Sequence, residues 1–164
     1  MHDSRPKAKI GKTILQDLRP GSLLGRIKKE WRALKHFYLD QERRQGPPSM
    51  INAGHMPPLI ASPDGLKELA KGDPAIRLKS STVFHEHTIH LKNNEVLLIY
   101  SDGLNEARNE DNIFWGEQPI KEILQKHVHR PTAEIGNALL VAFEKFTGDA
   151  PLFDDISLLL IWKK

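Results

Sequence analysis

Residues 95–103 have the sequence Glu95-Val96-Leu97-Leu98-Ile99-Tyr100-Ser101-Asp102-Gly103. The run that begins at Glu95 and ends at Tyr100 is apolar from its second residue onward. Such a run is typical of a β-strand that is buried on both faces of a sheet. Ser101, Asp102 and Gly103 are turn-forming residues, so we expect the strand to end abruptly after Tyr100.

A second run of this kind lies near the C-terminus. Residues 156–162 predict another buried strand, which Asp154 and Asp155 introduce. If the two strands are antiparallel neighbours, Asp102 and these two carboxylates emerge at the same edge of the sheet.

Carboxylates that lie close together repel one another unless they are protonated or bridged by a cation, and Mg²⁺ and Mn²⁺ suit oxygen ligands. Such a cation acidifies a bound water and neutralises a phosphoryl oxygen, as metal-assisted phosphate hydrolysis requires. The alternative is structural: Asp102-Gly103 is then an ordinary turn and Asp154-Asp155 an ordinary solvated entry into a strand.

The other elements are predicted from periodicity and turn residues. The expected helices are one after Ser22, one over 117–128, and one over 132–147 that Thr132 caps. The expected strands are 36–43, 49–53 and 78–91, with the first two joined as a hairpin and a loop between 53 and 78 that contains several prolines. Strands that come first and helices that come late favour an α+β fold.

Composition sets further limits. The chain has 164 residues, of which 39% are hydrophobic, and it has no cysteine. One soluble domain is expected, and disulfides, iron–sulfur clusters and thiolate nucleophiles are excluded. No apolar run approaches the roughly 18 residues of a membrane span, and residues 1–12 lack the apolar stretch of a signal peptide, which predicts a cytoplasmic protein with no membrane contact.

Charge is unevenly distributed, although the net charge is only +3. Residues 1–50 contain 12 basic and 5 acidic side chains. This segment is suited to an acidic partner or to nucleic acid, or it is simply solvated. No nucleic-acid motif accompanies the charge, so nucleic acid is not expected as a partner.

His85, His87 and His90 lie close together in the sequence and have two interpretations, a zinc site and a solvated edge strand. The solvated edge strand is preferred. His55 is expected to make a structural hydrogen bond. Ser101 lacks the Gly-x-Ser-x-Gly elbow of the hydrolases, which argues against a serine triad.

Four motifs, in order and in spacing, resemble one family. They are Asn52-Ala53-Gly54-His55-Met56-Pro57-Pro58-Leu59, residues 98–108 around Ser101-Asp102-Gly103, Phe114-Trp115-Gly116, and Asp154-Asp155-Ile156-Ser157-Leu158-Leu159. The chain is similar to the bacterial branch of the PPM (PP2C-type) serine/threonine phosphatases, the SpoIIE and RsbU group.

The resemblance implies a PP2C-like sandwich of antiparallel sheets flanked by helices. It also implies hydrolysis of phosphoserine or phosphothreonine with two Mn²⁺ or Mg²⁺ ions, on a substrate such as an anti-anti-sigma protein of the STAS type in stress or sporulation signalling. By the family pattern, Asp102 and Asp154 are metal ligands, and Asp155 supports them without binding the metal.

Two family motifs do not occur in the sequence: the Gly-Asp-Phe-x-Asp strand and the Asp-x-Ser-Gly-His-Gly turn, which complete the two-metal site. The chain is therefore expected to comprise an irregular basic segment, 1–14, and a partial PPM domain, 15–164, that is N-terminally incomplete. The alternative to an active phosphatase is a catalytically dead module that binds or scaffolds a partner. Exposed sheet edges predict a homodimer or low stability.

Overall fold

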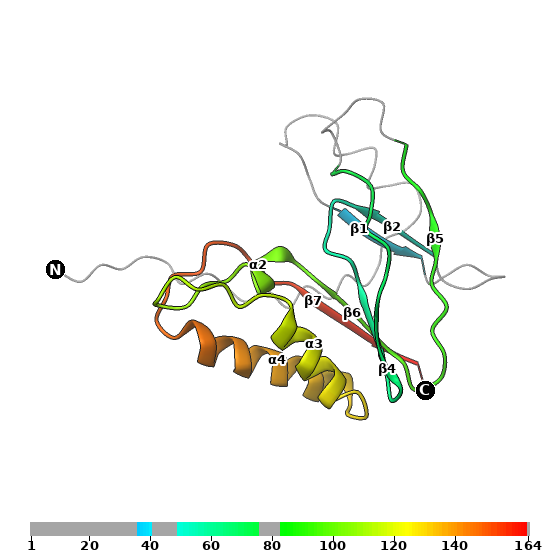
Figure 1. The fold of residues 1–164 in the computed structure, drawn as a ribbon. Coiled ribbons are helices and arrows are strands. Elements are labelled where there is room, and N and C mark those ends of the chain that lie inside the picture. Colours follow the sequence, from blue (N-terminus) through cyan, green and yellow to red (C-terminus); the bar gives the residue numbers. More distant parts are fainter. Residues whose placement is uncertain (1–35, 41–48, 76–82, 164) are drawn as a thin grey trace. The chain divides into compact units, whose positions relative to one another are not determined.

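The computed structural model of the chain describes residues 36–40, 49–75 and 83–163. They belong to two compact units (Figure 1), one that contains 58–69 and 91–163 and one within 13–57 and 70–90. The segment predicted at residues 1–14 and the helix predicted after Ser22 lie outside the described residues.

The larger unit is built on a four-stranded antiparallel sheet. Its strands are, in spatial order, β4 (Gly65–Glu68), β3 (Leu59–Ser62), β6 (Val96–Tyr100) and β7 (Leu158–Trp162). All five residues of β6 are buried, and Leu98 pairs with Leu59 on one side and with Leu160 on the other. The predicted strand at 95–100 and its antiparallel pairing with the C-terminal strand are confirmed. The residues of β7 are half-buried rather than buried as predicted, because β7 is the outer strand of this sheet.

A hairpin of β3 and β4 replaces the loop predicted in this region. The turn residues are as expected, because Ser62 Oγ donates to the carbonyl oxygen of Gly65 (3.1 Å) and accepts from the N–H of Asp64 (3.3 Å). The prediction of a loop was wrong because each strand has only four residues and prolines surround them, which weakens the local strand signal. β3 forms in spite of its weak strand signal because it pairs with the buried strand β6.

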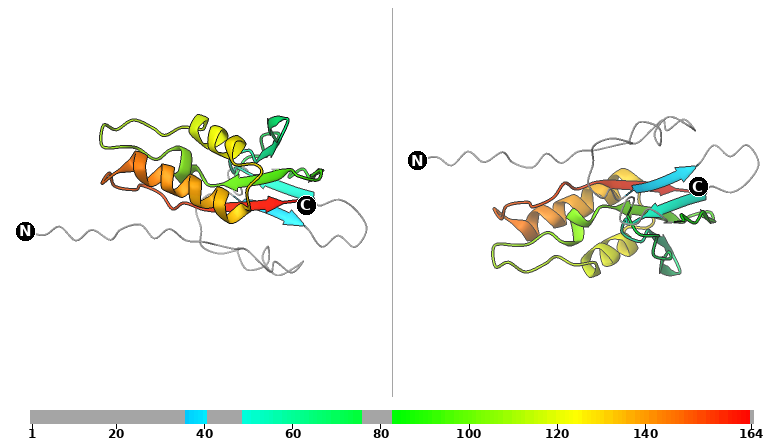
Figure 2. Two further views of the ribbon diagram at one scale, coloured as in Figure 1. Left: turned by 90° about the horizontal axis from the view of Figure 1, so that it is seen from below. Right: turned by 90° about the horizontal axis from the view of Figure 1, so that it is seen from above.

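Two helices lie on one face of this sheet (Figure 1 and Figure 2). They are α3 (Gln118–Lys126), which packs against β3 and β4, and α4 (Thr132–Thr147), which packs against β7 and α3. Both lie within the predicted ranges. Each helix buries apolar side chains from one face, namely Ile120, Leu124, Ile135, Leu139 and Phe143.

The N-cap of α4 differs from the prediction. Pro131 is the N-cap, and its carbonyl oxygen accepts from the N–H groups of Glu134 (2.9 Å) and Ile135 (3.1 Å). Thr132 is the first helical residue and makes no capping hydrogen bond. Proline fits this boundary because its extended backbone leads directly into the first turn.

The smaller unit contains a three-stranded antiparallel sheet of β1 (His36–Asp40), β2 (Ser49–Ala53) and β5 (His87–Thr88), in that order. The strand predicted at 49–53 is confirmed, and the one predicted at 36–43 is confirmed as far as Asp40. The prediction of one strand over 78–91 was wrong for the described residues 83–91. Within them only the two residues of β5, His87 and Thr88, pair with β2. The Thr, Val and Ile content of this segment favours a strand, but pairing with a neighbour decides it.

A tight turn follows β2 and is organised by Asn52. This side chain is 1% exposed, its Oδ1 accepts from the N–H of His55 (2.8 Å), and its Nδ2 donates to the carbonyl oxygen of His55 (3.2 Å). Gly54 has φ +81° and a Cβ there would lie 2.7 Å from that of Ala75, so only glycine fits. His55 Nδ1 accepts from the N–H of Met56 (3.1 Å), which confirms its expected structural role.

The described residues therefore form antiparallel sheets with a few helices, and the predicted α+β class is confirmed. Among the helices of this described part, none has the length and apolar character needed to cross a membrane.

Candidate functional site

Ser101 joins the neighbouring strands β6 and β7 of the larger unit at the end of the pair. Its N–H donates to the carbonyl oxygen of Ser157 (3.0 Å), its Oγ donates to the carbonyl oxygen of Asp155 (3.0 Å), and the same Oγ accepts from the N–H of Ser157 (2.9 Å). These bonds extend the pairing of β6 and β7 past Tyr100. The missing Gly-x-Ser-x-Gly elbow argues against a serine triad at Ser101. Its role in joining the two strands was not predicted, because an isolated serine at a strand end gives no signal for it.

Gly103 lets the two chain segments approach one another. A Cβ at Gly103 would lie 2.5 Å from the carbonyl oxygen of Asp155, closer than real Cβ contacts. Glycine is therefore required here by space and not by a positive φ. The short helix α2 (Asp102–Asn105) begins at this point, so Asp102 stands beside the segment that carries Asp154 and Asp155.

The predicted convergence of the acidic residues at one sheet edge is confirmed for the backbone. Asp102 is half-buried, whereas Asp154 and Asp155 are exposed. Asp154 Oδ1 accepts from the N–H of Asp155 (2.8 Å), which orients the Asp154 carboxylate. The structure thus brings together the three residues that the sequence singled out.

The carboxylates of this site have the right chemistry for a divalent cation, but they are too few to complete its coordination. The carboxylate oxygens of Asp102 and Asp154 are the hard ligands that Mg²⁺ and Mn²⁺ prefer, and Mg²⁺ commonly binds through one or two carboxylates while it retains waters. Within the described residues, no group of three or more His, Asp or Glu side chains is placed to hold a metal ion. The described part of the chain therefore supplies part of a ligand set.

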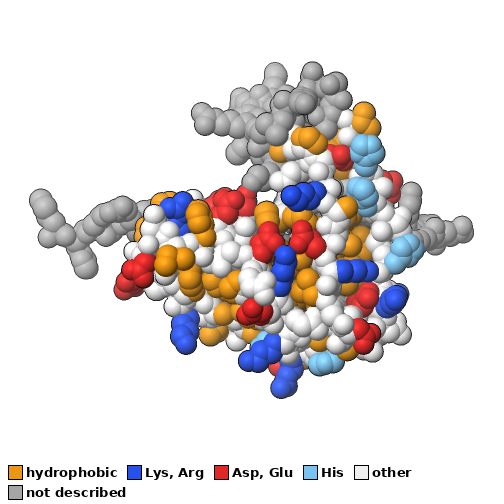
Figure 3. Space-filling view, viewed as in Figure 1, with side chains coloured by type: hydrophobic (Ala, Val, Ile, Leu, Met, Phe, Trp, Pro, Cys, Tyr) orange, Lys and Arg blue, Asp and Glu red, His pale blue; other side chains and the backbone are white. Residues whose placement is uncertain are grey.

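A pocket of about 330 Å³ lies beside Asp154. It is formed by two loops, one between α2 and α3 and one between α4 and β7, and its lining residues are Gly103, Glu106, Ala107, Arg108, Phe114, Leu152, Phe153 and Asp154. Three hydrophobic residues of these loops are strongly exposed, namely Ile113, Phe114 and Phe153. Hydrophobic side chains are visible on the surface of the larger unit (Figure 3). The pocket combines apolar walls with charged groups of both signs, so it suits a ligand with an apolar part and a charged part.

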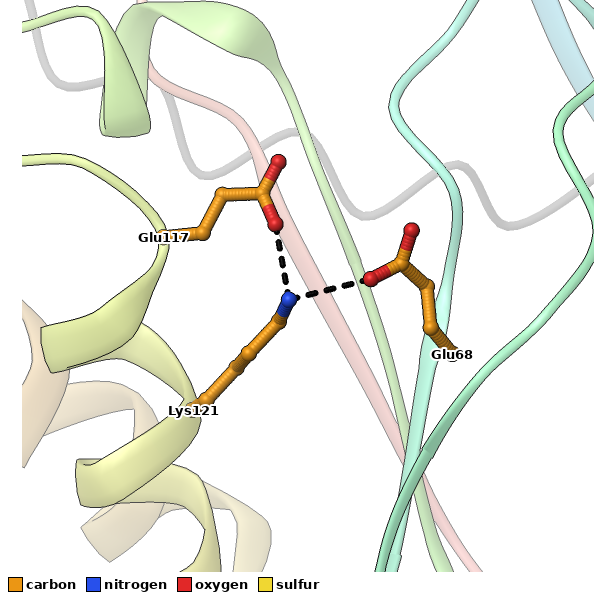
Figure 4. A network of polar contacts seen from close by, with 3 residues as sticks. All are labelled: Glu68, Glu117 and Lys121. Carbon is orange, nitrogen blue, oxygen red and sulfur yellow. Dashed lines mark hydrogen bonds and ion pairs between the residues drawn. The ribbon is translucent and has the colours of Figure 1, made fainter.

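A separate polar cluster joins α3 to β4 (Figure 4). Lys121 Nζ lies 2.8 Å from a carboxylate oxygen of Glu117 and 3.0 Å from one of Glu68. The hydrogen bond to Glu117 raises the pKa of Lys121, and the weaker contribution of the hydrogen bond to Glu68 acts in the same direction. Burial raises the pKa of Tyr100, at the end of β6, to about 12. These groups lie outside the pocket lining and stabilise the packing of α3 on the sheet.

His85, His87 and His90 do not gather with other ligating side chains into a group of three or more in the described part of the chain. His85 Nδ1 lies 2.9 Å from Asp73 Oδ1, and Asp73 Oδ2 accepts from the N–H of His85 (2.7 Å). These bonds to His85 lower the pKa of Asp73. The His85 side chain is 67% exposed, and β5 begins only at His87. The structure favours the solvated alternative to the zinc site over the described residues.

A model of the Stage II sporulation protein E (SpoIIE) family matches residues 10–163. The chain belongs to the SpoIIE family. Protein IcfG of Synechocystis sp. (strain ATCC 27184 / PCC 6803 / Kazusa) is 29% identical over 116 residues, which are 70% of this chain and 18% of IcfG. The chain therefore spans a small part of this relative.

Solved structures confirm the PP2C fold of this SpoIIE-family chain. The SiaA PP2C domain of Pseudomonas aeruginosa superposes with a TM-score of 0.62 at 21% identity, over 78% of this chain and 50% of that chain. The phosphatase domain of SpoIIE from Bacillus subtilis gives a TM-score of 0.54 at 16% identity, over 80% and 56%. The RsbU and RsbW domains of a Mycobacterium tuberculosis protein give 0.53 at 23% identity, over 69% and 31%. The chain covers about half of the first of these structures.

Proposed function

We propose that this chain carries part of the active site of a metal-dependent protein serine/threonine phosphatase. The proposal is carried by one observation: in a chain of the SpoIIE family, Asp102 and the Asp154-Asp155 pair lie at the same end of two hydrogen-bonded strands. Asp102 and Asp154 are the proposed metal ligands. A bound Mn²⁺ or Mg²⁺ would supply an acidified water and neutralise charge on a phosphoryl oxygen.

The neighbouring residues fix the position of these ligands. Ser101 holds the two strand ends together, and Gly103 permits their close approach. Asp155 supports Asp154 through its backbone N–H. Such preorganisation limits the motion of the two carboxylates and favours cation binding.

The proposed substrate is a phosphoserine or phosphothreonine protein, of the class of STAS-type anti-anti-sigma factors that act in bacterial stress or sporulation signalling. Membership of the SpoIIE family and the likeness to an RsbU domain support this class. We place the protein in the cytoplasm, as a possible homodimer, with neither nucleic acid nor membrane as a partner.

A catalytically inactive binding module is the second candidate. Two observations favour it: the two motifs that complete the family's metal site do not occur in the sequence, and the described residues offer no cluster of three ligands. Such a module would bind the same class of partner, with the basic segment 1–50 as a further contact.

The test is hydrolysis of a phosphoserine peptide with and without Mn²⁺, with Asp102→Asn as the control variant. Turnover that requires Mn²⁺ and is lost in Asp102→Asn supports the phosphatase. Wild-type turnover no higher than that of the variant, in protein shown by circular dichroism to be folded, rejects the phosphatase for this chain and favours the binding module.

A further inference from the structure

The loop between α2 and α3 forms one wall of the pocket and is well fixed. Arg108 and Phe114 form an antiparallel β-bridge, the N–H of Trp115 donates to the carbonyl oxygen of Ala107 (2.9 Å), and the ring of Trp115 packs edge-on against Phe143 of α4, with 5.5 Å between ring centres. A loop anchored in this way holds its side chains in a defined orientation before a ligand binds.

Arg108 is held in place within this loop. Its guanidinium carbon lies 4.1 Å from the centre of the Phe114 ring, and its Nη1 donates to Asn112 Oδ1 (2.6 Å). Arginine has five N–H donors, so this hydrogen bond leaves most of them available. Among the described residues, no carboxylate lies within ion-pair distance of Arg108, although Glu106 and Asp154 line the same pocket. A positioned cation without a carboxylate partner is suited to an anionic ligand.

The opposite wall is tied to this loop. Glu110 Oε1 accepts from the N–H of Asp149 (3.1 Å), at the start of the segment that leads to Leu152, Phe153 and Asp154. The hydrogen bond links the two loops that form the walls. Arg108 and the proposed metal ligand Asp154 both line the pocket between these walls.

We propose that Arg108 binds the phosphoryl group of the substrate and distinguishes a phosphorylated protein from an unphosphorylated one. The inference rests on the proposed function in that the ligand is a phosphoprotein. A guanidinium pairs with two phosphate oxygens at once, and the stacking on Phe114 leaves its edge free for this. The apolar walls, Leu152 and Phe153, contact the residues that flank the phosphoserine. The pocket volume of about 330 Å³ lies at the lower end for ligand sites and suits one phosphorylated side chain with part of a neighbour.

The test is binding of a short fluorescein-labelled peptide with a central phosphoserine, compared with the same peptide carrying serine. Fluorescence anisotropy in a chelator gives both affinities while turnover is prevented. The variants are Arg108→Ala and Arg108→Lys, and Arg130→Ala is the matched control. Arg130 is 65% exposed, precedes α4 and does not line the pocket, so this substitution removes the same charge elsewhere in the unit.

We expect wild type and Arg130→Ala to prefer the phosphopeptide by the same factor, and Arg108→Ala to lose about tenfold of that preference. Arg108→Lys keeps the charge but not the planar fork, so its preference falls between the two. The Arg108→Lys variant still tests the proposal if Arg108→Ala fails to fold. An unchanged preference in both Arg108 variants overturns the proposal, as does a wild type that does not distinguish the two peptides.

Two further results are needed. The first distinguishes a phosphopeptide from inorganic phosphate as the ligand, and the second distinguishes failure of the phosphatase proposal from failure of the Arg108 proposal. Inorganic phosphate that binds as tightly as the phosphopeptide would overturn the inference in favour of a simple phosphate site. If the wild type shows no Mn²⁺-dependent turnover, the phosphatase proposal is rejected. If the phosphopeptide preference is nevertheless lost in Arg108→Ala, the recognition role of Arg108 is supported.

Discussion

The Oγ of Ser101 donates a hydrogen bond to the carbonyl oxygen of Asp155 over 3.0 Å, and so joins two residues that are 54 positions apart in the sequence. The same oxygen accepts from the N–H of Ser157 (2.9 Å). One hydroxyl thus closes the end of the β6–β7 pair at the point where the acidic residues emerge. The geometry of the candidate site depends on this contact.

Replacement of Ser101 by alanine is expected to destabilise the fold by about 1 kcal/mol, the usual net value for lost hydrogen bonds of this kind. Urea denaturation measures the change. Ser157→Ala is the matched control, because Ser157 takes part in these contacts through its backbone. Equal stability of the two variants would contradict a clamping role for the Ser101 hydroxyl.

Glycine-to-alanine substitutions at two positions should have opposite effects. In Gly103→Ala, the new Cβ meets a backbone oxygen 2.5 Å away, so a loss of about 1–3 kcal/mol is expected. In Gly136→Ala, within α4, the nearest atom is 3.4 Å away and alanine favours the helix, so a gain of about 0.5–1 kcal/mol is expected. Thermal unfolding of both variants checks the pair, and a neutral Gly103→Ala would contradict the close approach to Asp155.

Alkaline pH should destabilise the fold through Tyr100. Burial raises its pKa to about 12, above the unfolded value of about 10, so the folded state retains the proton while the unfolded state loses it. This stability contribution is complete below pH about 10 and is lost as pH rises toward 12, at up to about 1.4 kcal/mol per pH unit. Lys121, whose pKa is also raised, acts in the same direction at high pH.

The matching experiment compares the free energy of unfolding of wild type and Tyr100→Phe at pH 8 and at pH 11. Phenylalanine cannot ionise, so the variant should lose less stability between the two pH values. The same loss in both proteins would show that Tyr100 does not contribute to the alkaline transition.

The outer strand β7 predicts self-association or low stability. It pairs with β6 and is the last strand of its sheet in the described part of the chain, with half-buried side chains. Such an edge offers backbone groups to a second copy. We expect a dimer in sedimentation analysis, or a low unfolding temperature in calorimetry. A monomer with a cooperative transition at high temperature would contradict this expectation.

The strands β6 and β7 and the helices α3 and α4 could be predicted from the sequence, because each carries a strong periodic or continuous apolar signal. β6 has five buried residues in a row, and α4 buries residues at helical spacing. The hairpin of β3 and β4 could not be predicted, since its four-residue strands are stabilised by pairing with β6 and not by their own composition.

The candidate site was predictable to the level of its carboxylates. Asp102 and Asp154 come together if the two recognisable strands pair antiparallel, and their assignment as metal ligands comes from the family resemblance. The clamp formed by Ser101 and the orientation of Arg108 were not predictable, because each depends on contacts that form only in the folded chain. Neither a lone serine nor an arginine in a polar loop carries a sequence signal for such a role.

The central claim is that Asp102 and Asp154 bind one divalent cation together, and titration of Mn²⁺ followed by electron paramagnetic resonance tests it most directly. We expect weak Mn²⁺ binding by the wild type, and affinities at least about tenfold lower in Asp102→Asn and in Asp154→Asn. Asp155→Asn should have a smaller effect, because the N–H that supports Asp154 is retained. Equal Mn²⁺ affinity in the wild type and the three variants would contradict the claim.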